Sequence, residues 1–242
     1  MEIALKEVSG SFHPLQMTFT RFLAGGLFLI PFAVRTLKKK KASLNWKDLP
    51  GFLLLGFVGM VLSMSIYQMS VKEVPASVVA VLFSSNPIFT AVLAFFMLKE
   101  PIRRNQIAAL LLEIGGILAI INPFHISLSP YGVLLAMIST LLFAVYGVMG
   151  KRRCARFGGV VVTCASFLCG GAEMLFMILF SRLPMVNKWL AGSGLELFAN
   201  IPLLSGYSWN TLPWMLMICI VNTGLGFACY FKAMEETSAQ ET

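Results

Sequence analysis

Three ionisable side chains that could do chemistry stand inside otherwise apolar stretches of this 242-residue chain: Arg21, Glu113 and Glu173. A charge is costly in membrane hydrocarbon, so such residues mark functional paths or buried contacts. Arg21 has two interpretations: its guanidinium reaches the headgroups along an apolar stem, or it is a cavity or gate group paired with a carboxylate such as Glu173. Glu113, beside Gly115-Gly116, is either a site of proton coupling or cation contact, or a protonated carboxyl that hydrogen-bonds between helices.

The most informative polar cluster is the run Ser84-Ser85-Asn86-Pro87. Proline removes one helical N–H bond and frees a backbone carbonyl one turn earlier. Such breaks persist in membranes where they line a cavity or face other helices. We therefore expect either a substrate-facing kink at this point or a packing kink in which the Ser84 and Ser85 hydroxyls satisfy the freed carbonyls.

Further polar groups lie in two other apolar stretches. Tyr67 and Tyr230 occupy equivalent positions of an internal repeat, and Gln68 and Asn222 stand close to them in the sequence. The tyrosines, with Tyr146, are either residues of the interfacial belt or, for the repeat-related pair, residues that line a pore. The candidate solute-binding residues are thus Arg21, Tyr67, Gln68, Ser84, Ser85, Asn86, Pro87, Glu113, Asn222 and Tyr230.

The elements that must position these residues are membrane-spanning helices. Apolar residues make up 57% of the chain and charged residues 12%, against roughly 25% charged residues in soluble domains. Helices of about 20 apolar residues cross a bilayer, and we expect an all-α integral membrane protein. Paired glycines within them, such as Gly115-Gly116, are expected to allow close contact between helices. The predicted spans are Leu15–Val34, Pro50–Val71, Ala76–Leu98, Asn105–Ile121, Tyr131–Gly150, Phe157–Ser181 and Thr211–Phe231.

The basic residues predict the orientation of these spans. Most of them lie in the segments after the first, third, fifth and seventh spans, such as Lys38–Lys41 and Lys151–Arg156. Basic loops remain in the cytoplasm, so we expect a multi-pass protein of the plasma or inner membrane with these loops inside. The net charge of +8 is then a topology signal, and no nucleic-acid partner is expected.

The internal repeat predicts how the spans are organised. Arg21–Gly26 matches Ser166–Gly171, and a later pairing joins Leu62 to Leu225. The repeat unit has five helices, and an odd unit inserts its two copies in opposite orientations. We expect two inverted repeats, residues 1–122 without a first helix and residues 130–242 without the last two, so that seven of ten helices are present.

The same segments resemble the drug/metabolite transporter superfamily, and specifically its EamA-type permeases. The resemblance covers nearly the whole chain and depends on His13–Gly26 and on Ala76–Gln106, which includes Lys99-Glu100-Pro101. It implies ten helices in two inverted halves and the transport of small metabolites such as amino acids and related solutes by alternating access. A nucleotide-sugar or lipid-headgroup carrier of the same fold, or a non-functional transporter fragment, is the alternative.

Other classes of function fit the residues poorly. The two histidines and the single Asp48 provide neither clustered acid/base groups nor an HExxH motif, and the five cysteines lack metal-ligand spacing. No spanning segment has a lysine that could hold retinal as a Schiff base. We therefore expect no enzyme, cofactor or metal, and the expected partners are the lipid bilayer, a small solute and a coupling proton or cation; the sequence leaves the oligomeric state open.

Overall fold

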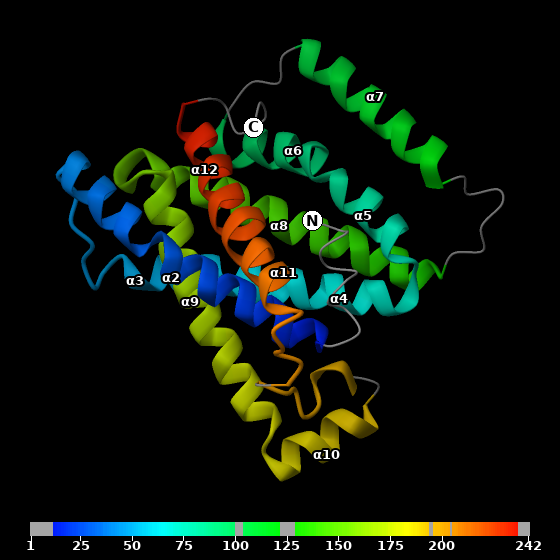
Figure 1. Cartoon of the computed structure of the whole chain (residues 1–242). Helices are drawn as coiled ribbons and strands as arrows, with labels where there is room; N and C mark the ends of the chain where they lie inside the picture. The colour runs from blue at the N-terminus through cyan, green and yellow to red at the C-terminus, as the bar shows by residue number, and fades with distance from the viewer. Residues whose placement is uncertain (1–11, 100–103, 122–128, 194–195, 204, 237–242) are drawn as a thin grey trace.

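The computed structural model describes residues 12–99, 104–121, 129–193, 196–203 and 205–236, and these residues form helices and connecting segments without a β-strand. Long helices cross one another to form a bundle, as Figure 1 shows. In chain order the helices are α2 (Pro14–Lys40), α3 (Leu49–Gly56), η1 (Phe57–Ser63), α4 (Met64–Glu73), α5 (Ala76–Ser84), α6 (Asn86–Leu98), α7 (Arg104–Ile121), α8 (Pro130–Phe157), α9 (Gly159–Ser181), α10 (Pro184–Gly192), η2 (Glu196–Phe198), α11 (Leu212–Leu216), η3 (Met217–Leu225) and α12 (Gly226–Glu236).

Six helical segments of the described residues are long and apolar enough to cross a membrane. They overlap six of the seven predicted spans, with ends that differ by up to several residues. The seventh prediction, Asn105–Ile121, falls on α7, whose described apolar part, Gln106–Gly116, is shorter than a span. The prediction of an all-α membrane protein is confirmed, whereas the described residues support six spans and one shorter apolar helix.

Local residues explain where several helices begin and end. Proline stands in the first turn of α2, α6 and α8, where its missing N–H costs no helical bond. The side chain of His13 accepts a hydrogen bond from the N–H of Leu15 at the start of α2, at 3.3 Å. Between α8 and α9 the backbone turns at Gly158, whose φ of +91° lies in the region that favours glycine.

Two of the spans contain a π-helix, which the sequence did not predict. The segment η1 connects α3 to α4, and η3 connects α11 to α12. The repeat pairing of Leu62 with Leu225 brings η1 and η3 largely into register. A π-helix is uncommon and is found frequently at functional sites, so its presence at equivalent positions of both repeats indicates a shared feature of the two copies.

Glycines allow each repeat to pack closely on the π-helix of the other. A Cβ atom at Gly25 of α2 would lie 3.1 Å from the carbonyl oxygen of Cys219 in η3. A Cβ atom at Gly170 of α9, the repeat equivalent of Gly25, would lie 2.7 Å from the Cβ of Met60 in η1. Small residues at helix interfaces permit such close approach, and here they join the two copies of the repeat.

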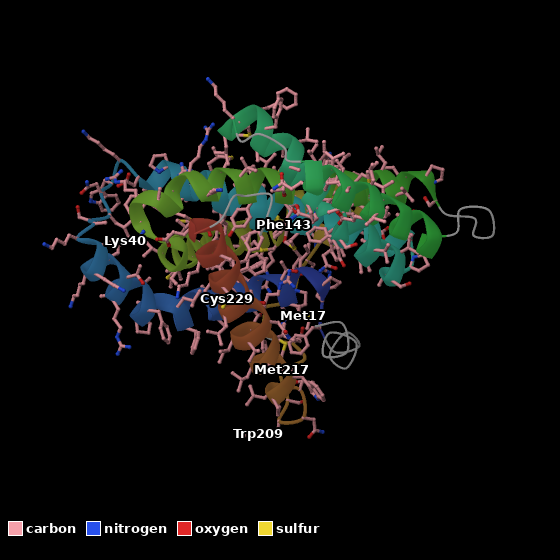
Figure 2. All side chains as sticks on the ribbon, turned by 90° about the horizontal axis from the view of Figure 1, so that it is seen from above. Met17, Lys40, Phe143, Trp209, Met217 and Cys229 are labelled. Atoms are coloured by element: carbon pink, nitrogen blue, oxygen red, sulfur yellow. The ribbon has the colours of Figure 1, made fainter. Side chains whose placement is uncertain are left out.

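Specific contacts bring the basic helix ends together at one end of the bundle, which we call the basic end. Lys40 at the end of α2 forms an ion pair with Glu235 of α12, and Glu235 also accepts a 3.0 Å hydrogen bond from the N–H of Gly159. Arg156 near the end of α8 pairs with Asp48 at 2.8 Å. Figure 2 shows Lys40 at one end of α2 and Met17 near the other.

At the opposite end of the bundle, side chains donate hydrogen bonds to backbone carbonyls of other segments. Gln16 is fully buried and donates to the carbonyls of Leu203 and Ser205 at 3.2 and 2.8 Å. Ser70 donates to the carbonyl of Gly132 at 2.7 Å. These bonds attach the segment before α11 to α2, and the end of α4 to the start of α8.

Candidate functional site

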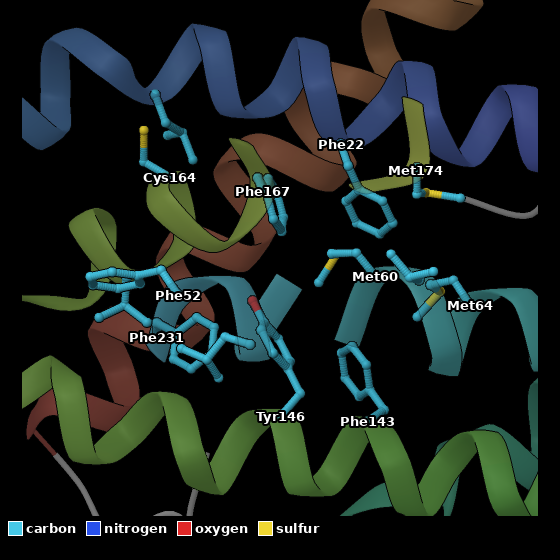
Figure 3. Packing of buried hydrophobic residues seen from close by; sticks show 14 of the residues in the cluster. Phe22, Phe52, Met60, Met64, Phe143, Tyr146, Cys164, Phe167, Met174 and Phe231 are labelled. Atoms are coloured by element: carbon cyan, nitrogen blue, oxygen red, sulfur yellow. The ribbon is translucent and has the colours of Figure 1, made fainter. Parts of the chain in front are cut away.

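The centre of the bundle holds a set of touching aromatic rings, which we call the central aromatic cluster. Neighbouring ring centroids lie 5.0–6.2 Å apart, the range of favourable edge and tilted contacts. Figure 3 shows part of it, with Phe22 and Phe143 directed toward each other from opposite helices. Its members come from α2, α5, α8, α9 and α12 and are Phe22, Phe83, Phe143, Tyr146, Phe167, Phe227 and Phe231.

Arg21 lies at the edge of this cluster. Its guanidinium carbon is 4.7 Å from the centroid of the Phe22 ring, and its Nη2 atom donates to the sulfur of Met64 at 3.1 Å. The residue is only 7% exposed. A guanidinium over an aromatic face gains cation–π attraction, and more so away from water. The inward-facing interpretation of Arg21 therefore fits this geometry, whereas a side chain that reaches the headgroups does not.

Asn86 and Tyr230 meet beside the cluster residue Phe231. Their side chains share a hydrogen bond, and the Tyr230 ring lies 5.3 Å from that of Phe231. The Oδ1 atom of Asn86 and the hydroxyl of Thr90, one turn later on α6, are buried without a hydrogen-bond partner among the described residues. A buried acceptor without a partner is costly, so these two atoms can accept hydrogen bonds from a bound solute.

Tyr67 and Gln68 are neighbours on α4. The Tyr67 ring makes an edge contact of 5.2 Å with Phe83, which connects it to the cluster. Gln68 donates to the hydroxyl of Thr18 at 3.4 Å. On η3, the amide nitrogen of Asn222 is buried without a partner among the described residues. The structure thus gathers Arg21, Tyr67, Asn86 and Tyr230 around the cluster, through direct ring or hydrogen-bond contacts.

The predicted break in the third span is present between α5 and α6. The hydroxyls of Ser84 and Ser85 each donate to a carbonyl three residues earlier, at 2.6 Å. Pro87 falls in the first turn of α6, where no helical bond is lost. The serines therefore bond carbonyls in the last turn of α5, those of Val81 and Leu82. Asn86 is the member of this group that reaches the cluster, because it contacts Tyr230, whose ring lies beside Phe231.

Glu113 is separate from the other candidate residues. It is half-buried on α7, which packs against α5 and lies at the edge of the bundle in Figure 1. A Cβ atom added at Gly115 or at Gly116 would have no described atom within 4 Å. The expectation that this glycine pair packs closely on another helix is therefore wrong for the described part of the chain.

The structure also overturns the expectation that Tyr146 lies in the interfacial belt. A place in the interfacial belt was one prediction, but the residue is fully buried in the middle of the bundle. Its hydroxyl lies 3.1 Å from that of Ser166, and Figure 3 shows its ring among Phe143, Phe167 and Phe231. The sequence signal that could have revealed it is the α8 register, since Phe143 and Tyr146 are separated by three residues and share one helix face.

Three cavities that described residues line lie outside the central aromatic cluster, whose rings fill the centre of the bundle. One of about 470 Å³ is at the basic end, and one of about 60 Å³ adjoins Lys72 and Tyr131. The largest, about 600 Å³, is an apolar groove between η1 and α9 that contains Glu173. Glu173 thus faces this groove, and its pairing with Arg21 stays a prediction.

The comparisons with known proteins agree with the resemblance stated above. A model of the EamA-like transporter family matches residues 2–122 and 130–242. An uncharacterized transporter of Clostridium kluyveri is 30% identical over 236 residues, which cover 95% of this chain and 70% of the relative. The uncharacterized inner membrane transporter YedA of Escherichia coli K12 is 28% identical, with coverage of 89% and 75%.

A solved crystal structure has the same fold. It superposes with a TM-score of 0.71 at 18% sequence identity, over 98% of this chain and 75% of that one. The identity is too low to transfer any binding residue, so this likeness supports the arrangement of helices alone.

Proposed function

This chain belongs to the EamA-like transporter family, a family of multi-pass membrane transporters and not of enzymes, and we propose that it carries a small polar or amphipathic metabolite by alternating access. Amino acids and related solutes are the substrate class that we infer. We place the solute beside the central aromatic cluster, between the two copies of the repeat.

The observation that carries this proposal is the convergence of both repeats on one site. Arg21 and Asn86 come from the first copy and Tyr230 from the second, and all three contact residues of the cluster or one another. The guanidinium suits a carboxylate, and the amide and hydroxyl acceptors suit an ammonium group. Such a pair of opposite contacts matches a zwitterionic solute.

The repeats also provide a means of motion. We infer that residues 1–122 and 130–242 form inverted repeats, which rock against each other around a fixed site. The contacts of Gly25 with η3 and of Gly170 with η1 form the surface on which they move. The π-helices η1 and η3 are the points where each spanning helix can bend, because a π-turn loosens the regular helical bonding.

The basic end defines the proposed orientation. It gathers the ends of α2, α8 and α12, and positively charged loops are retained in the cytoplasm. We therefore place this end in the cytoplasm and the protein in the cell membrane. Glu113 is the group that we propose for coupling to a proton or cation.

Solute counterflow in proteoliposomes tests the proposal. We expect saturable counterflow for at least one member of a panel of amino acids and related metabolites. Asn86→Ala and Tyr230→Phe should raise the half-saturating concentration about tenfold, since each removes a hydrogen bond to a charged solute. Tyr131→Phe, a change at an exposed tyrosine, is the matched control and should leave counterflow unchanged.

Two results would count against this account. The absence of saturable counterflow across the whole panel would contradict the transport proposal. Equal effects of Tyr230→Phe and Tyr131→Phe would contradict the position of the site. Coupling is measured separately, because Glu113→Gln should abolish acceleration by a pH gradient and leave counterflow, which needs no gradient, intact.

A further inference from the structure

We propose that the basic end of the bundle contains a binding site for a phosphate group, formed by the last turns of α8. The 470 Å³ cavity opens there. Arg152, Arg153 and Arg156 line it together with one carboxylate, that of Asp48, and the other lining side chains are methionine and phenylalanine. Three guanidinium groups from a single helix end therefore line one open cavity.

Among the described residues of this cavity, one carboxylate faces three guanidinium groups. The Nη1 atom of Arg156 pairs with the carboxylate of Asp48 at 2.8 Å. Arg152 and Arg153 instead donate to neutral backbone carbonyls, those of Met97 and Met149. A carbonyl orients a guanidinium without cancelling its charge, so the cavity keeps an excess of positive charge on the side of Arg152 and Arg153.

The position of Arg153 depends on a glycine of another helix. Its guanidinium carbon lies 5.8 Å from the ring centroid of Phe52 on α3. A Cβ atom at Gly51 would lie 2.8 Å from that same carbon, inside van der Waals contact. Gly51 therefore makes the space that the guanidinium occupies, and the group lies within cation–π range of the Phe52 ring.

The donors of this cavity suit a phosphate group. The planar donors of arginine match the oxygens of phosphate with two parallel hydrogen bonds. Basic pockets between helices near the cytoplasmic face of a membrane are suited to phospholipid headgroups. Basic residues that only set the orientation in the membrane need no cavity and no glycine beside an arginine. Lys38 and Lys39, for example, carry positive charge on an exposed helix end.

The test is binding of phosphatidylglycerol by the purified chain in detergent, measured by native mass spectrometry over a range of lipid concentrations. Phosphatidylcholine, which has no net charge, is the reference lipid. We expect saturable binding of phosphatidylglycerol and a loss of about tenfold in affinity for Arg153→Gln, as one charge-assisted hydrogen bond requires. Gly51→Ala should also lower the affinity, because its Cβ would displace the Arg153 guanidinium. Lys39→Gln removes the same charge outside the cavity and should change affinity by less than about twofold.

The source of the phosphate is resolved by competition with glycerol 3-phosphate. Displacement of the lipid indicates a site for soluble phosphate esters, and retention of the lipid indicates a headgroup site; both support the proposal. Equal losses for Lys39→Gln and Arg153→Gln would show diffuse charge attraction and overturn it, as would the absence of saturable binding. If Gly51→Ala lowers the melting temperature, Arg152→Gln replaces it as the second variant.

Discussion

Gly170 and Gly171 are neighbours on α9, but their surroundings differ. A methyl group at Gly170 would lie 2.7 Å from the Cβ of Met60 and 3.2 Å from the Cα of Gly56. At Gly171 the nearest atom, on Leu23, would be 3.5 Å away, an ordinary van der Waals contact. We predict that alanine is tolerated at Gly171 and is destabilising at Gly170.

The magnitude follows from the difference between these two sites. Alanine improves helix propensity by about 0.8–1 kcal/mol at either position, so this term cancels when the variants are compared. At Gly170 the obstructing atoms are the Cβ and Cγ of Met60 in η1 and the backbone Cα of Gly56 in α3, so the helices must separate. Overpacking of this kind costs about 1–3 kcal/mol, and Gly170→Ala should be less stable than Gly171→Ala by that amount.

The assay is unfolding by sodium dodecyl sulfate in mixed micelles, followed by tryptophan fluorescence and far-UV circular dichroism. The two variants have the same composition and differ by one position, so detergent effects are matched. Equal free energies of unfolding for Gly170→Ala and Gly171→Ala would refute the conclusion that Gly170 sets the distance between α9 and η1.

Three further predictions concern the described hydrogen bonds and ion pairs. Tyr146→Phe removes the hydroxyl bonded to Ser166 and should reduce the free energy of unfolding by about 0.5–1.5 kcal/mol in the same assay; no change would contradict this bond. Gln16→Ala removes the donor to two backbone carbonyls of the segment before α11, so limited proteolysis should cut that segment faster, and an unchanged rate would contradict its attachment to α2. Burial raises the pKa of Glu235, but the ion pair with Lys40 and the hydrogen bond from a backbone N–H outweigh it and hold the pKa below the ordinary value of 4.5. Stability from a lowered pKa is present at neutral pH and is lost as the pH falls through the folded-state pKa, so acidification below about pH 4.5 should lower the melting temperature of the wild type more than that of Glu235→Gln, and equal losses would contradict this role.

The helical spans could be predicted from sequence because hydropathy is a local property. Six predicted spans match long apolar helices, and the break near Asn86 was expected from Pro87. The family was identified because the segments His13–Gly26 and Ala76–Gln106 occur in order along the chain. These features depend on residues that are close together in the sequence, so no knowledge of packing was needed.

The central aromatic cluster and the π-helices could not be predicted in the same way. Each ring comes from a span that is apolar throughout, so periodicity does not show which face is buried. Tyr146 illustrates this, since a position near a span end suggested the interface although the ring lies at the centre. The π-helices η3 and η1 pack against Gly25 and Gly170 of the opposite copy of the repeat, and these contacts involve residues far apart in the chain.

The most direct test of alternating access is the labelling of Asn86→Cys in a variant whose five native cysteines are replaced. Membrane-impermeant thiol reagents are added to either side of sealed proteoliposomes, with and without the transported solute. We predict that the reagent reaches the position from both sides and that the solute slows labelling from each. Labelling from one side only, at a rate that the solute does not change, would contradict a site that opens alternately to the two sides.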